Sequence, residues 1–413
     1  MIENNNKNDK ERTLLIALDC GEYDAEVSMK ELWELAKTSG AEVIGEVIQK
    51  RPSPEASTYL GKGMLEEVRL FCEQNDIDLI ISDSELSPVQ VRNIENYTNV
   101  RVIDRTTLIL DIFAGRARSS EGKLQVELAQ LKYALPRLTG KGTALSRLGG
   151  GIGTRGPGET KLETDKRHIR FRIQNLKNEL DKVEKRRNAM HERRRKNGAL
   201  CVAIVGYTNA GKSTLMNRLT NAGVLQEDKL FATLDPTARK LTLPDSQQIM
   251  LIDTVGLVRR LPHQLVDAFR STLEEAVWAD VILNVCDASS EECAEHIQVT
   301  MKLLDELGCK DKPIINVLNK CDMATELGFD FFENGVKISA LTGEGIDILL
   351  SAISKALPRN RRRVEILLPF DKLGLASIAR EGVLHSEKYT ENGLFLDATI
   401  DIKNFKAIED YII

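Results

Sequence analysis

The 413-residue sequence contains no apolar run that reaches the ~18 residues needed to span a bilayer. Its first ten residues, Met1–Lys10, are polar and rich in asparagine, and they lack the apolar centre of a secretion signal. No C-x-x-C pair occurs among the seven cysteines, which argues against a zinc site and against a disulfide framework. We therefore expect a cytoplasmic protein with no membrane span and with reduced, mostly buried thiols.

The sequence also has no overall excess of positive charge. Its formal net charge of −5 argues against a protein that binds nucleic acid over its whole surface. Hydrophobic residues make up 42% and charged residues 29%, as in ordinary globular proteins. Because one compact domain rarely holds so many residues, we expect about three or four folded units. A monomer is the expected state, although the sequence leaves the oligomeric state open.

Short β-type runs alternate with helical runs over residues 11–116, after an expected disordered tail at residues 1–10. This alternation is typical of a small parallel sheet covered by helices. The expected strands are Leu14–Leu18, Val43–Val47, Leu79–Ser82 and Val100–Ile103, and the expected helices are Met29–Lys37, Met64–Asn75 and Pro88–Tyr97.

Two apolar seams predict an antiparallel helical hairpin at residues 117–198. The seam residues are Leu124, Leu128, Leu131 and Leu135 in the first helix, and Ile169, Ile173, Leu176, Leu180 and Val183 in the second. They recur every three or four residues, which is the spacing of a coiled-coil seam. Between the seams, residues 139–158 hold eight glycines and Pro157, so we expect a glycine-rich loop rather than a helix there.

The rest of the chain is expected to form two further units. Residues 199–358 have the pattern of one complete α/β domain with a doubly wound, mostly parallel sheet. Residues 359–413 predict a small α+β domain, because Asn392-Gly393 is a strong hairpin turn between the runs Val383–Tyr389 and Leu394–Ile402. The predicted class is therefore a multidomain α/β protein.

A phosphate-binding loop is predicted where the buried strand Cys201–Val205 ends. The sequence Gly206-Tyr-Thr-Asn-Ala-Gly-Lys-Ser213 has the G-x-x-x-x-G-K-[ST] pattern and leads into a helical run. Its glycines let backbone N–H groups curl around phosphate, and the N-terminus of the helix adds positive potential. Lys212 is expected to reach the β- and γ-phosphates, and the Ser213 hydroxyl to ligate Mg²⁺. The predicted phosphate-binding residues are Gly206, Tyr207, Thr208, Asn209, Ala210, Gly211, Lys212, Ser213 and Thr214.

A second buried strand, Gln248–Asp253, ends in a carboxylate and is followed by Thr-Val-Gly. Asp253 is expected to hold Mg²⁺ through water, and the Gly256 N–H to contact the γ-phosphate. A threonine between the loop and this strand should complete the magnesium site, and Thr233 is favoured over Thr237. The predicted catalytic residues are Lys212, Thr233 and Gly256, and the predicted magnesium ligands are Ser213, Thr233 and Asp253.

A third strand, Pro313–Leu318, leads into Asn319-Lys320-Cys321-Asp322. The Asp322 carboxylate can accept both N1–H and the 2-amino group of guanine, whereas adenine would leave it unpaired. An unpaired buried polar group costs roughly 1–3 kcal/mol, so this motif predicts a preference for guanine. Lys320 can cover the base, and N–H groups of residues 339–341 can meet guanine O6. The predicted guanine-binding residues are Asn319, Lys320, Asp322, Ser339, Ala340 and Leu341.

The position after Gly256 holds Leu257 instead of the glutamine that orients the attacking water in many small GTPases. A leucine cannot orient water, so we expect slow hydrolysis unless another group stabilises the transition state. Asn209 could supply it by ligating K⁺ against the phosphates, or it could simply shape the loop.

Together, these motifs resemble the HflX family of ribosome-associated GTPases. The resemblance extends to Phe231–Arg239, to the glycine-rich signature Gly149–Lys161 with the following Leu162–Asp165, and to Thr58–Gly63 and Val102–Thr106. It covers nearly the whole chain. Leu257 is one small departure, because phenylalanine is more usual there in this family.

The resemblance implies a GTPase that binds the large ribosomal subunit, with its hairpin loop near the peptidyl-transferase region. It also implies a role in splitting stalled or hibernating ribosomes, often after heat or antibiotic stress. ATP binding by the N-terminal part has been proposed for relatives. Here the local support for it is Gly61-Lys62-Gly63, which is too short to define a nucleotide site.

A local excess of positive charge independently favours contact with RNA. Residues 161–196 hold 14 lysines and arginines against 6 acidic residues. A basic helix beside a glycine-rich loop suits a crowded, phosphate-lined surface, although many basic runs are only solvated helix faces. The candidate RNA contacts are Arg147, Arg155, Arg186, Arg187, Arg193, Arg194, Arg195 and Lys196.

Three functions remain open from the sequence. The first is a GTP-switched factor that binds the ribosome and its RNA. The second is a GTPase switch that acts on a protein partner without RNA contact, which the basic hairpin argues against. The third is a small-molecule kinase with a phosphate loop, which Asn319 and Asp322 argue against.

Overall fold

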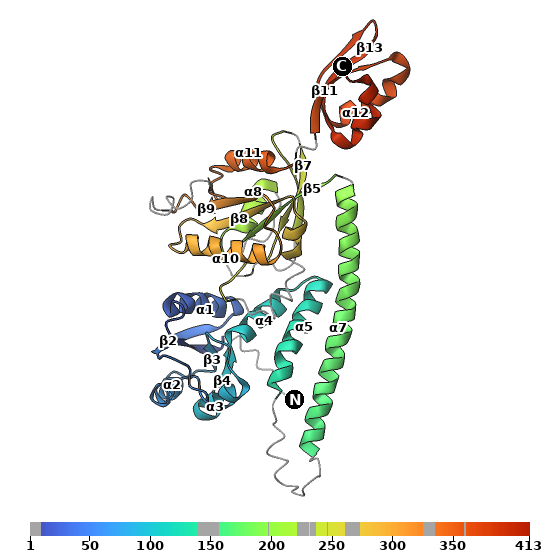
Figure 1. Ribbon diagram of the computed structural model, residues 1–413. Coiled ribbons are helices and arrows are strands. Elements are labelled where there is room, and N and C mark those ends of the chain that lie inside the picture. The colour runs from blue at the N-terminus through green and yellow to red at the C-terminus, as the bar shows by residue number, and fades with distance from the viewer. Residues whose placement is uncertain are drawn as a thin grey trace, which may run out of the picture.

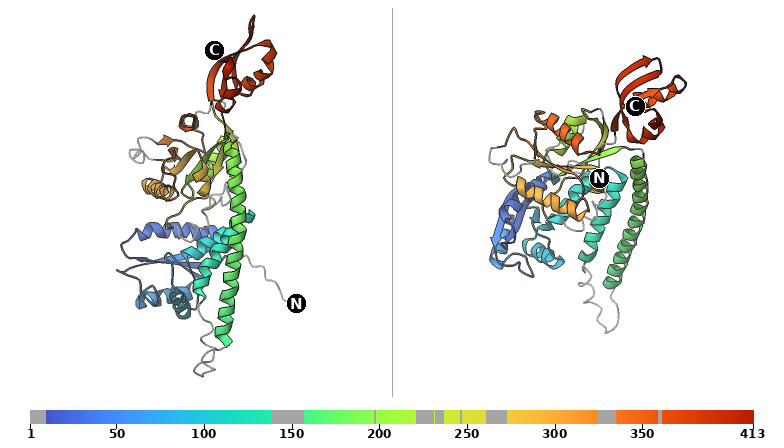
Figure 2. Two further views of the ribbon diagram at one scale, coloured as in Figure 1. Left: turned by 45° about the vertical axis from the view of Figure 1, so that its right-hand side comes forward. Right: turned by 45° about the horizontal axis from the view of Figure 1, so that its top comes forward.

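The computed structural model describes residues 10–138, 157–196, 198–220, 231, 237–245, 247–260, 273–324, 335–358 and 361–413. An N-terminal α/β domain, a helical hairpin, a second α/β domain and a strand-rich C-terminal domain follow one another along the chain (Figure 1). The predicted multidomain α/β class is confirmed. The long helix α7 (Pro157–Lys196) runs alongside both α/β domains (Figure 2). None of the helices in these ranges is long and apolar enough to cross a bilayer.

Parallel strands form the sheet of the N-terminal domain, in the order β2-β1-β3-β4. The strands are β1 (Arg12–Asp19), β2 (Glu42–Lys50), β3 (Leu79–Ser82) and β4 (Arg101–Asp104), and the helices between them are α1 (Ala25–Ser39), α2 (Lys62–Gln74) and α3 (Pro88–Thr98). Each predicted strand and helix of this domain is confirmed, with ends that shift by a few residues. The strand order reverses beside β1, so a crevice at the carboxyl ends of β1 and β3 is the usual place for a ligand.

A helix that the sequence did not reveal, α4 (Arg105–Arg116), follows β4 directly. Its residues Leu108, Ile109, Ile112 and Phe113 are all nearly fully buried. They pack on the sheet, on α1 and on the first hairpin helix in one hydrophobic core. A helix covered on several sides lacks the one-sided apolar periodicity that marks an amphipathic helix.

The helical hairpin consists of α5 (Ser120–Arg137) packed along α7. Leu176 is fully buried, and the other predicted seam residues of α7 are less exposed than the residues beside them. The predicted loop was wrong at its end, because Pro157 begins α7 and Gly158 follows it in the helix. Proline is favoured in the first turn because its missing N–H has no intrahelical partner there. The rest of that loop lies outside the described residues.

The second α/β domain is built on a sheet of order β10-β9-β8-β5-β7-β6, in which β6 alone runs antiparallel to its neighbour. The strands are β5 (Leu200–Gly206), β6 (Thr237–Thr242), β7 (Gln248–Asp253), β8 (Val281–Asp287), β9 (Ile314–Asn319) and β10 (Val336–Lys337), and the helices are α8 (Lys212–Thr220), α10 (Cys293–Glu306) and α11 (Ile346–Ala356). The predicted doubly wound, mostly parallel sheet is confirmed.

The C-terminal domain is a three-stranded antiparallel sheet of order β11-β13-β12 with short helices on it. Its elements are β11 (Arg361–Leu368), η2 (Phe370–Leu375), α12 (Ala376–Glu381), β12 (Val383–Thr390), β13 (Gly393–Asp401), η3 (Ile402–Ala407) and η4 (Glu409–Tyr411). Thr390 pairs with Gly393, which confirms the hairpin predicted from Asn392-Gly393. Gly393 has a φ of 139°, a conformation that glycine adopts without strain.

Candidate nucleotide site

The glycine-rich loop Gly206–Ser213 lies between β5 and α8, at the carboxyl edge of the sheet. Gly206 has a φ of 148°, and a Cβ there would lie 2.1 Å from the Val285 carbonyl oxygen. Gly211 has a φ of 87°, and its Cβ would lie 2.2 Å from Asn319 Nδ2. Both positions therefore require glycine, for backbone conformation and for space.

Lys212 is buried inside this loop, and its ammonium group donates to two loop carbonyls. Nζ lies 3.1 Å from the Gly206 oxygen and 2.7 Å from the Tyr207 oxygen. Burial lowers the pKa of Lys212 to about 8, and the nearby Asp253 carboxylate acts in the opposite direction. A cation held in place at the start of a helix is well suited to a phosphate group.

Hard oxygen donors stand next to the loop. The Ser213 hydroxyl donates to Asp253 Oδ2 over 3.0 Å, and Asp253 is fully buried. A hydroxyl and a carboxylate beside a phosphate-binding loop fit Mg²⁺, which uses few protein ligands together with phosphates and water. No group of three His, Cys, Asp or Glu side chains suited to a metal occurs in the ranges that the structure describes.

The chain after Asp253 is hydrogen-bonded to the loop. Leu257 N donates to the Gly206 oxygen over 3.1 Å, and Thr208 N donates to the Leu257 oxygen over 2.8 Å. The Leu257 side chain is buried against Tyr207 and Leu273, so it belongs to a hydrophobic core. A methyl group on Gly256 would lie 2.7 Å from Thr208 Cγ2, which shows how closely the chain covers the loop.

Asn319 joins the loop to the segment after β10. Its Nδ2 donates to the Ala210 oxygen over 2.8 Å, and its Oδ1 accepts from Ala340 N over 2.9 Å. With 2% of its surface exposed, Asn319 braces two segments of the predicted site. Lys320 Nζ contacts Asp287 Oδ2 over 2.6 Å.

The other predicted guanine-binding residues lie in the segment that contains Asn319 and in the segment after β10 to which Asn319 is hydrogen-bonded. Asp322 and Leu341 are exposed, whereas Ser339 and Ala340 are buried. The Arg218 guanidinium donates to the carbonyl oxygens of Ala340 and Leu341. The structure thus brings the Asn319–Asp322 and Ser339–Leu341 segments to one end of the loop, as parallel strands do with the segments that follow them.

The structure describes Asn209, the candidate K⁺ ligand, but of the two candidate magnesium threonines it describes only Thr237. Asn209 is exposed and has a φ of 59°, so its left-handed backbone shapes the turn whatever its side chain binds. Thr233 lies outside the described residues. Thr237, the alternative, begins β6 and pairs with Asp253 across the sheet.

The basic residues of α7 do not share one environment. Arg186 and Arg193 are exposed, and Arg194 is partly buried. Arg187 points inward and forms ion pairs with Glu121 and Glu274, which corrects its placement on a free basic face. The side chains of Arg195 and Lys196, and the whole of Arg147 and Arg155, lie outside the described residues.

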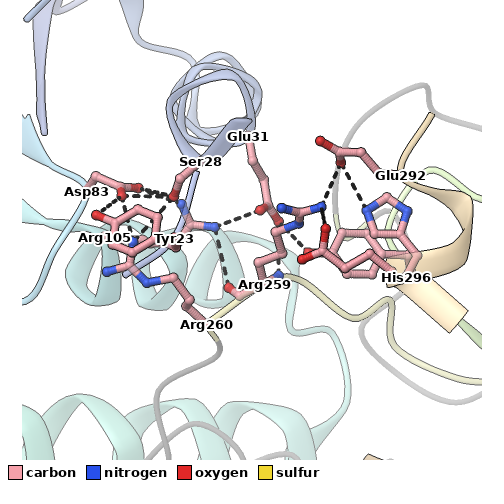
Figure 3. Close-up of polar contacts among 11 residues, drawn as sticks. Tyr23, Ser28, Glu31, Asp83, Arg105, Arg259, Arg260, Glu292 and His296 are labelled. Atoms are coloured by element: carbon pink, nitrogen blue, oxygen red, sulfur yellow. Dashed lines mark hydrogen bonds and ion pairs between the residues drawn. The ribbon is translucent and has the colours of Figure 1, made fainter. Parts of the chain in front are cut away.

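The N-terminal domain supplies contacts to the site that sequence reasoning missed. The Tyr207 hydroxyl donates to Glu31 Oε1 over 3.2 Å, and Arg259 N donates to the same atom over 3.2 Å. Figure 3 shows that Glu31 reaches from α1 toward Arg259 and Arg105. No local pattern could reveal this contact, because 176 residues separate Glu31 from Tyr207.

A doubly wound sheet that carries a phosphate loop, an aspartate-ended neighbouring strand and an Asn-Lys-Cys-Asp segment at the same edge defines a P-loop GTPase. Comparisons with known proteins agree. Residues 26–114 match the family described as GTP-binding GTPase N-terminal, residues 116–194 match the GTP-binding GTPase middle region, and residues 201–320 match the 50S ribosome-binding GTPase family.

The chain belongs to the HflX family of GTPases, and hydrolysis of GTP is its activity. It is 50% identical to GTPase HflX of Caldanaerobacter subterraneus subsp. tengcongensis, over 98% of this chain and 94% of that protein. It is 49% identical to GTPase HflX of Lacrimispora saccharolytica, over 97% and 96% of the two chains. It is 43% identical to GTPase HflX of Escherichia coli, over 83% and 82%.

Proposed function

We propose that this GTPase binds the large ribosomal subunit in its GTP form and splits or rescues stalled or hibernating ribosomes under stress. The observation that carries the proposal is α7, a basic helix of 40 residues that lies alongside the GTPase domain and presents Arg186 and Arg193 to solvent. Membership of the HflX family, and the match of residues 201–320 to a ribosome-binding GTPase family, support it.

In this proposal the nucleotide lies along the loop and its two neighbouring segments. Lys212 holds the β- and γ-phosphates, Ser213 and Asp253 hold Mg²⁺, and the Gly256 N–H faces the γ-phosphate. When bound, Mg²⁺ neutralises charge that develops on the phosphates. At the other end, Asp322 accepts from guanine, while Asn319 keeps the two binding segments in register.

The base preference is tested by replacing Asp322 with asparagine. An amide can donate to the 2-oxo group of xanthine but cannot accept both guanine donors, so D322N should lose GTP affinity and gain affinity for xanthosine triphosphate. Binding is measured by competition against fluorescent GDP, with ATP as the comparison nucleotide. Equal affinity of the wild type for ATP and GTP would contradict the assignment of this site to guanine.

Hydrolysis is proposed to be slow without the ribosome, because the position after Gly256 holds a buried leucine. The most informative experiment measures GTP turnover with and without purified large subunits, in K⁺ and in Na⁺. We expect large subunits to raise the turnover rate. If Asn209 ligates K⁺ at the phosphates, turnover is faster in K⁺, whereas equal rates leave Asn209 with the shaping role of its left-handed backbone.

RNA contact is tested by charge reversal at the carboxyl end of α7. The variant R193E/R194E/R195E should co-sediment more weakly with large subunits and should keep its GTP affinity, because phosphate contacts contribute much of the affinity for nucleic acid. A matched control reverses the chain's other arginine triplet, Arg361–Arg363, in the C-terminal domain. Equal losses in both variants would show that net charge matters rather than α7, and unchanged co-sedimentation of the α7 variant would contradict the proposal.

A further inference from the structure

The short segment after Gly256 is held by the N-terminal domain as well as by its own domain. Arg259 N donates to Glu31 Oε1, and Glu31 Oε2 lies 3.0 Å from Arg105 Nη2 in the N-terminal core. The Arg259 side chain instead pairs within the GTPase domain, with Glu292 before the first turn of α10 and with Glu295 inside it, over 3.0 and 2.9 Å. The backbone of Arg259 therefore contacts the N-terminal domain, whereas its side chain contacts its own domain.

The Arg260 side chain lies at the carboxyl end of the N-terminal sheet, beside Tyr23 and Asp83 (Figure 3). Its Nη1 lies 2.7 Å from Asp83 Oδ2, and its Nη2 donates to Ser84 Oγ over 3.2 Å. The guanidinium carbon stands 4.0 Å from the centre of the Tyr23 ring. In many doubly wound sheets a ligand binds at this edge, and here an arginine of the neighbouring domain contacts it.

The partner of Arg260 is Asp83, a buried carboxylate of the N-terminal domain. Asp83 is fully buried, and it also accepts from Ser28 Oγ and from Arg105 Nη1. The Asp83 carboxylate therefore has a second cationic partner, Arg105, in addition to Arg260. The Arg260 side chain is 35% exposed, so part of it already faces solvent.

The backbone at Arg260 is held in a less common conformation. Its φ is 51°, a left-handed value that costs a residue with a side chain on the order of 1 kcal/mol. The contacts to Asp83, Ser84 and Tyr23 offset this cost only while Arg260 is seated. Because the backbone strain at Arg260 is relieved when the contact with Asp83 breaks, this segment is suited to two states, one docked and one released.

The segment that leads to Arg260 packs against the Lys212 ammonium group, where the γ-phosphate is proposed to lie. A methyl group on Gly256 would lie 3.1 Å from Lys212 Nζ, so the chain packs directly on the ammonium group. A phosphoryl group held by Lys212 needs this chain to move outward. Leu257 is hydrogen-bonded to the loop, and Arg260 follows it by three residues. An outward movement of this chain would therefore strain the contact between Arg260 and Asp83.

We propose that Arg260 is a nucleotide-sensitive latch: seated on Asp83 it holds the two domains together, and the γ-phosphate of GTP withdraws it. This inference rests on the proposed assignment of Lys212 and Gly256 to the γ-phosphate. By linkage, a ligand that opens the latch binds more tightly when the latch is already broken. GDP, which has no γ-phosphate, leaves Arg260 seated.

The test compares wild-type protein with R260A, and with R69A as a matched control. Arg69 is also an arginine of an ion pair, with Glu66 on α2. Calorimetry gives the affinities for GDP and a non-hydrolysable GTP analogue. Coupling between sites typically amounts to a factor of about 5–150, so we expect R260A to raise the ratio of GTP-analogue to GDP affinity by at least about fivefold. R69A should leave the ratio unchanged.

Hydrogen–deuterium exchange over Ala25–Ser39 supplies a second readout. The GTP analogue should raise exchange of this helix in the wild type, and R260A should show the raised level with GDP alone. R260K, which keeps the charge but not the two-pronged contact, should lie between them. An unchanged affinity ratio with unchanged exchange would overturn the latch while leaving the nucleotide assignment intact. A wild type without preference for guanine nucleotides would overturn both.

Discussion

Tyr207 of the phosphate loop is stacked on His296 of α10, with ring centroids 3.8 Å apart and planes inclined by 13°. His296 is also 3.3 Å from Glu292, and the Tyr207 hydroxyl reaches Glu31 on the other side of the domain boundary. Tyr207 thus ties the loop to His296 through its ring and to the N-terminal domain through its hydroxyl group. A protonated imidazole would need to be desolvated in this place, which is unfavourable.

Acid should therefore weaken the fold through His296. Burial and the neighbouring Arg259 lower the His296 pKa to about 4, while the unfolded chain titrates near 6.5. As pH falls from 6.5 toward 4, the unfolded state takes up a proton that the native state does not, so stability is lost in this window. We expect a loss of about 2 kcal/mol at pH 5 from this residue, measured as a shift in urea unfolding between pH 7 and pH 5.

The control for this prediction is a second histidine substitution. H296Q should reduce the acid-dependent loss, whereas H385Q, at an exposed position of β12, should retain it. The same acid dependence in H296Q and wild type would show that other groups cause the loss.

Replacing Arg105 with methionine should destabilise the N-terminal domain strongly. Arg105 is 3% exposed and pairs with both Asp83 and Glu31, over 2.8 and 3.0 Å. Removing one member of a buried charged group leaves carboxylates without compensation and costs about 3–5 kcal/mol. Thermal and urea unfolding measure the effect. R69M, in an exposed pair on α2, should change unfolding little, and equal effects of the two substitutions would contradict the prediction.

Alanine at Gly206 should abolish nucleotide binding. The added Cβ would lie 2.1 Å from the Val285 oxygen, and the φ of 148° is unfavourable for alanine, so the loop must shift. Filter binding or calorimetry with GDP checks the loss. The matched control is G63A in the first turn of α2, where a Cβ meets nothing within 4 Å. G63A should bind GDP normally and should be as stable as the wild type or slightly more so.

Replacing Asn319 with alanine should weaken GDP binding, although the Asn319 amide forms its hydrogen bonds with the protein itself. The change leaves the Ala210 oxygen and the Ala340 N–H without their partner, and an unsatisfied buried group costs about 1–3 kcal/mol. We expect an affinity loss on the order of tenfold or more, measured by competition with fluorescent GDP. N93A, which removes a surface bond to the Ser57 oxygen, should bind GDP as the wild type does.

Most of the fold was predictable because its signals are local. The strands and helices of the N-terminal domain follow from alternating runs, and the turn at Asn392-Gly393 follows from two adjacent residues. The helix Arg105–Arg116 was missed because the core covers it on several sides and leaves no one-sided pattern. Gly158 was assigned to a loop from its composition, although a proline before it favours the start of a helix.

The sequence alone determined the chemistry of the nucleotide motifs, because each is a contiguous run whose stereochemistry is set by its own residues, such as the glycines of Gly206–Ser213. Only the tertiary structure decided how those motifs are supported. Asn319 joins two segments of the site, Arg187 pairs with Glu274, and Arg260 pairs with Asp83, which is 177 residues away in the sequence. Such contacts depend on how whole domains pack, and no spacing along the chain encodes which distant carboxylate an arginine will meet.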